Sequence, residues 1–152
     1  MTITSVRVRG ILDSRARVTL EAEVTLESGH LGIGSAPRAI APGRLERRRG
    51  PEPVLGPVAV PLLTAALTGA DVESQQRCDE RLVEVYEAGE AGSDLTLAVS
   101  LAHARAAAAA RGVPLHAHLA EQYGVTGPGL PRLMVNVFSG GIHRAGPPRG
   151  FQ

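Results

Sequence analysis

The chain of 152 residues contains no lysine, and all sixteen of its basic residues are arginines. A reaction that needs a lysine as general base or as Schiff-base nucleophile therefore cannot be run by these residues alone. Fifteen acidic residues offset the arginines and leave a net charge of +1. This balance argues against a strongly basic nucleic-acid-binding protein, so we expect no nucleic-acid partner.

Aromatic side chains make up only 3% of the residues. The core must therefore be built from leucine, valine, isoleucine and alanine, and stacking platforms for bases or sugars are nearly absent. The single cysteine, Cys78, excludes an internal disulfide and a cysteine-based zinc site. Because Cys78 falls on an apolar helical stripe with Leu82 and Val85, we interpret it as a core residue rather than a nucleophile.

No apolar run approaches the ~20 residues that a membrane-spanning helix needs. The first residues also do not combine a basic region with an apolar stretch, as a secretion signal does. We therefore expect a cytoplasmic protein with no membrane partner. Its composition, 43% apolar and 20% charged, is that of a folded domain with a real core.

Strict alternation of apolar and polar residues over 18–27 predicts a strand with one buried and one acidic face. Residues 28–30 read as a turn, 31–36 as the returning strand and 3–9 as a third strand. Together they predict a three-stranded antiparallel meander, whose apolar face must be covered by other elements.

A helical cluster is predicted to follow, which makes the fold class α+β. The expected helices are 58–68, a helix capped by Asp71, 95–111 and 114–122.

The segment 95–111 is the strongest helix signal, because six alanines occur within seven consecutive positions. We expect Ser93 or Asp94 to cap it, and we expect His103 to be a half-exposed surface histidine. The side expected to be buried carries Leu97, Leu101, Ala98 and Ala102.

Residues 37–57 are rich in proline and glycine and hold five arginines between Arg38 and Arg49. A solvated loop is favoured over an anion site, and binding of nucleic-acid phosphates by these arginines ranks last among the functions considered. Beyond 124–131, a Gly/Pro linker, the run 133–138 predicts a buried strand of the kind found in parallel sheets.

Three motifs, in the same order along the chain, resemble the enolase (phosphopyruvate hydratase) family. Residues 11–15, Ile-Leu-Asp-Ser-Arg, with 19–24 resemble the family's opening I-L-D-S-R run and the strand after it. Residues 97–107 with 112–115 resemble its alanine-rich helix and G-x-P-L exit. The segment from Leu130 to His143 resembles its L-P-x-P-M-x-N-x-x-N-G-G-x-H run.

The resemblance implies an enolase-like N-terminal α+β domain over 1–123. Residues 124–152 would then be a linker and the start of a β/α barrel, with 133–138 as an orphan first barrel strand. A complete barrel needs ~250 residues, so the resemblance implies a truncated and divergent relative.

The family's chemistry requires groups that this chain does not carry. In the family, magnesium held by three barrel carboxylates binds the substrate and a barrel lysine removes its carbon-bound proton. Ala41 stands where the family's mobile loop has a serine that ligates a second magnesium. The resemblance therefore implies no catalytic residue and no metal ligand on this chain. Magnesium is expected only if a partner supplies a barrel.

Four residues match family positions with other roles. His143 and, more loosely, Gln152 match residues that contact substrate, a role expected here only beside a partner barrel. Arg15 and Glu21 match positions at the family's subunit interface, although an ordinary exposed ion pair would also explain them.

Two functions follow from the resemblance. The first is a domain that is not catalytic alone and serves as a dimerisation or interaction module, or is a degenerate remnant. The second is one half of a split enolase-type lyase whose barrel lies on another chain. Such a pair would convert 2-phosphoglycerate to phosphoenolpyruvate or act on a related phosphonate. The expected partner is accordingly a second copy or an enolase-type barrel chain.

Overall fold

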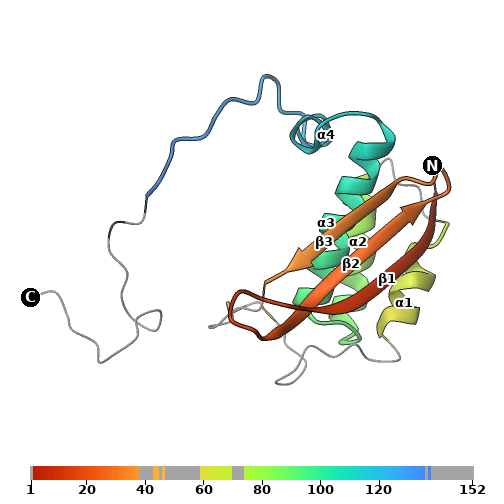
Figure 1. The fold of residues 1–152 in the computed structure, drawn as a ribbon. Helices are drawn as coiled ribbons and strands as arrows, with labels where there is room; N and C mark the ends of the chain where they lie inside the picture. Colours follow the sequence, from red (N-terminus) through yellow and green to blue (C-terminus); the bar gives the residue numbers. More distant parts are fainter. Residues whose placement is uncertain are drawn as a thin grey trace, which may run out of the picture.

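The computed structural model describes residues 2–37, 43–44, 46, 59–69, 74–135 and 137. They form an antiparallel sheet in the order β1-β2-β3, covered on one side by helices (Figure 1). The strands are β1 (Ile3–Leu12), β2 (Val18–Leu26) and β3 (Leu31–Ala36). The helices are α1 (Ala59–Leu67), α2 (Gln75–Glu87), α3 (Ser93–Ala110) and α4 (Leu115–Gln122). The predicted α+β class and three-stranded meander are confirmed.

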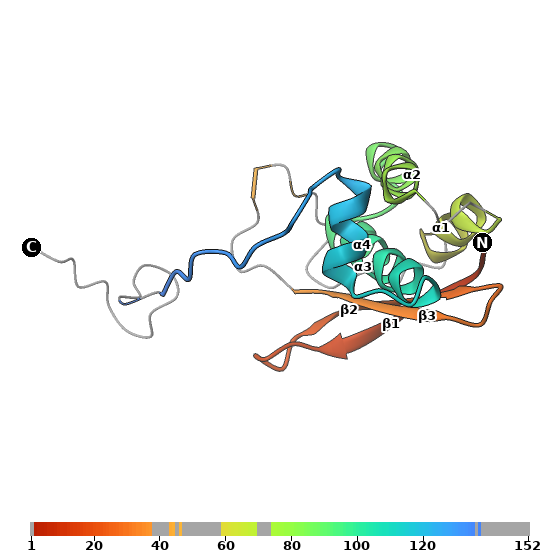
Figure 2. The ribbon, with the colours of Figure 1, turned by 90° about the horizontal axis from the view of Figure 1, so that it is seen from above.

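The alternation in β2 sets the two faces of the sheet. Leu20, Ala22, Val24 and Leu26 point toward the helices and are buried. The intervening residues lie on the other face, where Glu21 is opposite Arg9 and Glu23 is opposite Arg7. Among the described elements the helices all lie on the apolar face, as seen from above (Figure 2).

Helix α3 packs directly on β3 because both present almost no side chain at their contact. A Cβ added to Gly32 would lie 2.0 Å from the carbonyl oxygen of Ala102, and one added to Gly34 would lie 2.2 Å from that of Ala98. Both distances are far below any real carbon–oxygen contact, so only glycine fits there. The alanine-rich sequence of α3 therefore supports close packing as well as helix propensity.

The other helices complete the core. Leu63 and Leu67 of α1 are fully buried, and α1 contacts β1. Cys78 lies in the core with Leu82 and Val85, as predicted, and burial raises the pKa of its thiol to about 12. A thiol with such a pKa stays protonated and unreactive at neutral pH.

Several details of the helices differ from expectation. Helix α2 is capped by the Ser74 side chain, which accepts from the Arg77 amide at 3.2 Å, while Asp71 lies outside the described residues. Helix α3 begins at Ser93 with Gly92 as N-cap, so neither Ser93 nor Asp94 occupies the N-cap position. Leu97, expected to be buried, is 47% exposed because it lies at an open groove between α2 and α3.

The predicted strand at 133–138 is not confirmed. Its described residues, 133–135 and 137, adopt no strand, and their apolar side chains are exposed. The chain after α4 instead extends away from the helices in both views (Figures 1 and 2). Of the helices in the described part of the chain, none is both long enough and apolar enough to span a bilayer.

Candidate functional site

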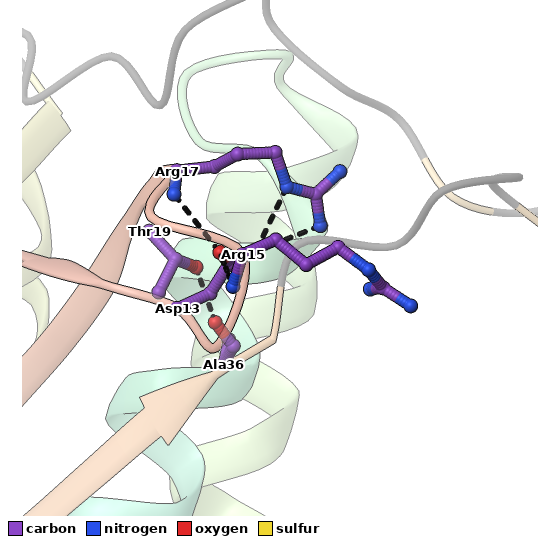
Figure 3. Close-up of polar contacts among 5 residues, drawn as sticks. All are labelled: Asp13, Arg15, Arg17, Thr19 and Ala36. Carbon is purple, nitrogen blue, oxygen red and sulfur yellow. Dashed lines mark hydrogen bonds and ion pairs between the residues drawn. The ribbon is translucent and has the colours of Figure 1, made fainter. Parts of the chain in front are cut away.

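The β1–β2 hairpin contains residues 11–15, the run that resembles the opening motif of the enolase family, and its turn is held together by Asp13 (Figure 3). Its Oδ1 accepts from the amides of Arg15 at 2.8 Å and Arg17 at 2.9 Å. Its Oδ2 accepts from the Arg17 guanidinium, with Nε at 2.9 Å and Nη2 at 2.7 Å. These bonds, led by the Arg17 amide, lower the pKa of Asp13 to about 2. Asp13 therefore stays charged and fixes the turn at physiological pH.

Arg15 is the side chain that this turn presents outward. Its amide is bound by Asp13, but its guanidinium is exposed and points away from the hairpin (Figure 3). No hydrogen bond or ion pair joins that guanidinium to another side chain of the described residues. The hairpin therefore displays one cation on a fixed backbone.

Glu21, the other expected interface residue, is already paired within the chain. Its Oε1 accepts from Arg9 Nε at 2.7 Å, and its Oε2 accepts from Ser35 Oγ at 3.1 Å. These contacts link all three strands on the sheet face away from the helices. The structure therefore gives Glu21 a role in the sheet and does not bring it to the hairpin turn beside Arg15.

The remaining predicted site residues cannot be placed. Ala41, His143 and Gln152 all lie outside the described residues. Within the part of the chain that the structure describes, no three His, Cys, Asp or Glu side chains gather as a metal site would require.

A polar cluster between α2 and α3 was not expected; two of its members, Gln75 and His103, are buried, and the other two, Asp79 and Ser100, are partly buried. Gln75 Nε2 donates to Asp79 Oδ1 at 2.9 Å and to Ser100 Oγ at 3.1 Å. Ser100 Oγ donates to the same Asp79 oxygen at 2.7 Å. Gln75 Oε1 lies 2.8 Å from His103 Nδ1. The cluster joins the beginning of α2 to the middle of α3.

His103 belongs to this cluster and is fully buried, which corrects the expectation of a surface histidine. It is buried because the face of α3 that does not contact the sheet packs against α2 and α4. Since Gln75 Oε1 can only accept, His103 carries its proton on Nδ1, and its Nε2 is an acceptor. Burial lowers the pKa of His103 to about 4 despite the opposing charge of Asp79.

His118 of α4 is the counterpart of His103. Its Nδ1 lies 3.2 Å from Arg111 Nη1, which can only donate, so His118 carries its proton on Nε2. Neither Nε2 atom has a hydrogen-bond partner, and both are buried. The two rings are close enough for a charge on His118 to lower the pKa of His103. With these tautomers, His103 Nε2 is a buried acceptor and His118 Nε2 a buried donor, and neither is satisfied by another group of the described residues.

A groove runs along the outer side of α2. One hollow of about 280 Å³ lies between α2 and α3, and a second of about 620 Å³ lies between α2 and the end of α4. Asp79 and Val83 line both hollows, so the two hollows adjoin each other along α2. We call this surface the α2 groove. Its walls include Leu82, Val83, Tyr86, Leu97, Asp79 and Glu84.

The polar cluster and the α2 groove were missed because each depends on packing between helices. A signal for the cluster was present in the spacing, since Gln75 and Asp79 are four residues apart and Ser100 and His103 three apart. Polar residues at such spacing on otherwise apolar helix faces indicate a buried network.

A comparison with known protein families finds none that matches the chain.

Proposed function

We propose that residues 1–123 act as an enolase-type N-terminal domain that is not catalytic alone and serves as a dimerisation or interaction module. The observation that carries the proposal is the β1–β2 hairpin. Its motif residues build a turn locked by Asp13, and the exposed Arg15 guanidinium projects from it. A planar cation on a fixed turn suits a two-point contact with a carboxylate of another subunit.

The non-catalytic half of the proposal rests on reaction chemistry. Removing a weakly acidic proton from carbon needs a tuned base next to a divalent cation. The enolase-type base is a lysine, and these 152 residues contain none. Any such reaction would therefore need a base from outside them.

Sedimentation velocity over a range of concentrations tests the module. We expect a reversible dimer that Arg15→Glu weakens by at least about tenfold, since a like charge replaces one side of the contact. Arg77→Glu makes the same charge change at an exposed position of α2 and should leave the dimer intact. A wild-type chain that remains monomeric up to roughly 1 mM would contradict self-association.

The claim that the chain is not catalytic alone is tested with the same purified protein. This protein should not dehydrate 2-phosphoglycerate in the presence of magnesium. Turnover above that of a mock preparation from the same host would refute the proposal.

A second candidate, one half of a split enolase-type lyase, is favoured by the exposed residues after α4. Leu133 and Met134 are more than nine-tenths exposed, and an apolar run of this kind gains free energy when another chain covers it. In that assembly His143 and Gln152 would contact substrate, and carboxylates of the partner barrel would hold magnesium.

Mixing the chain with an enolase-type barrel chain tests this candidate. Activity on 2-phosphoglycerate should appear only in the mixture and be lost with His143→Ala. A stable complex without activity would argue against the candidate.

A further inference from the structure

The α2 groove has an apolar wall that the described chain leaves uncovered. Val83 of α2 and Leu97 of α3 are about half exposed on either side of it, at 50% and 47%. Leu82 is buried beneath them and Tyr86 lies at the end toward the start of α3. A surface of this kind favours an occupant with apolar side chains.

The groove also carries negative charge, and the described residues that line it include no basic side chain. Asp79 lines both hollows, and its Oδ1 is bound by Gln75 and Ser100. No ion pair joins Asp79 to a basic side chain of the described residues. Glu80 and Glu84 line the hollow next to α4 and add to the negative charge. The occupant should therefore combine apolar side chains with an arginine.

Residues 130–135, Leu-Pro-Arg-Leu-Met-Val, have this combination. Arg132 lies between Leu130 and Leu133, and all three side chains are exposed. Pro131 fixes its own φ angle and biases Leu130 before it toward extended backbone, which lowers the entropy cost of binding. The segment thus matches the α2 groove in both polarity and charge.

We propose that the α2 groove binds residues 130–135 of a second copy of this chain, and that two copies exchange these segments reciprocally. Arg132 pairs with Asp79 of the other copy, and Leu133 and Met134 cover Val83 and Leu97. This inference rests on the proposed function, because it adds to the Arg15 hairpin a second surface through which the chain associates with itself.

A second copy is favoured over the same copy by the path of the chain. After α4, Gly124 and Gly127 adopt positive φ angles of 66° and 64°. The described residues beyond them run away from the helices in both views (Figures 1 and 2). Each copy therefore keeps a groove and displays a segment. A twofold exchange buries both in one step without leaving an unmatched surface.

Mixing two variants in sedimentation velocity provides the test. Val83→Asp alters the groove, and Leu133→Asp combined with Met134→Asp alters the segment. All three are exposed side chains, so the fold should persist, as circular dichroism would verify. Each variant alone should dimerise at least about tenfold more weakly than wild type. An equimolar mixture should recover a heterodimer, because it retains one intact groove and one intact segment. Leu31→Asp, at an exposed leucine of β3 outside the groove, should dimerise like wild type.

The remaining outcomes separate this inference from the proposed function. If both variants dimerise normally while Arg15→Glu does not, the inference fails and the proposed function stands. If the wild-type chain is monomeric throughout, both fail. If amides 133–135 of a monomer are protected from exchange independently of concentration, the segment binds its own groove and the inference is overturned.

Discussion

At the scale of single residues, Asp13 determines whether the family-like motif forms a fixed turn. One carboxylate binds two amides and one guanidinium, so its charged form is far more stable in the folded chain than in the unfolded chain. The folded pKa of about 2 lies below the ordinary 3.8. The stability that Asp13 adds is therefore complete above pH 4 and is lost as the pH falls toward 2.

Replacing Asp13 tests this dependence directly. Asp13→Asn keeps an oxygen for the two amides but removes the charge that holds Arg17. We expect a lower melting temperature at pH 7 and a smaller loss of stability between pH 4 and pH 2 than in wild type. Thermal unfolding monitored by circular dichroism over this range measures both. Glu84→Gln, at an exposed carboxylate of α2, should retain the wild-type profile.

His103 makes the stability of the fold depend on pH in a higher range than Asp13 does. Its folded pKa of about 4 lies below the ordinary 6.5, so the unfolded chain binds the proton more readily between these values. Stability should therefore decrease as the pH falls from 6.5 to 4. His103→Leu should flatten this part of the profile in urea unfolding, whatever its effect at neutral pH. His30→Gln, in the exposed turn after β2, serves as the matched control. An unchanged slope in His103→Leu would show that another group is responsible.

At the scale of helices and strands, the strands were predicted well because a period of two leaves little ambiguity once one face is buried. The bounds of β2, β3, α1 and α4 differ from expectation by no more than one residue at either end, whereas β1 continues to Leu12 beyond the predicted end at residue 9. Burial on α3 was predicted less well. Periodicity assumes one covered face, whereas α3 contacts the sheet and also α2 and α4, which buries His103 and leaves Leu97 at the groove.

The contact between α3 and β3 gives a prediction at this scale. Gly34→Ala would place a methyl group 2.2 Å from the carbonyl oxygen of Ala98, and backbone on both sides restricts relief. We expect destabilisation of about 1–3 kcal/mol or more in chemical denaturation. Gly129→Ala is the matched control, because nothing lies within 4 Å of its added methyl and stability should hardly change. Equal stability of Gly34→Ala and wild type would show that α3 does not pack this closely.

At the scale of the whole molecule, the sequence predicted the architecture and only part of the candidate site. Arg15 and Glu21 came from the family resemblance; the structure leaves the Arg15 guanidinium exposed and pairs Glu21 within the sheet. The α2 groove could not be predicted, because it forms where three helices meet and not within any one motif. The exposure of residues 133–135 could not be predicted either. Their apolar character predicted burial, and their exposure follows from the path of the chain after α4.

Hydrogen exchange over the whole chain tests whether residues 133–135 are exposed while the middle of α3 is protected. In dilute protein the amides of 133–135 should exchange within seconds, whereas those in the middle of α3 should be among the slowest. Raising the concentration should slow exchange at 133–135 if copies associate through this segment. Slow exchange there in a dilute monomer would contradict the exposed conformation.

The bare contact between Gly32, Gly34 and the α3 backbone also limits how this domain can change over time. A larger residue on the strand requires the helix to move outward, and that movement would open the space that the alanines fill. Substitutions at the two glycines of β3 and at the alanines of α3 are therefore not independent of each other. Divergent descendants should retain this pair of small-residue surfaces together or replace both at once.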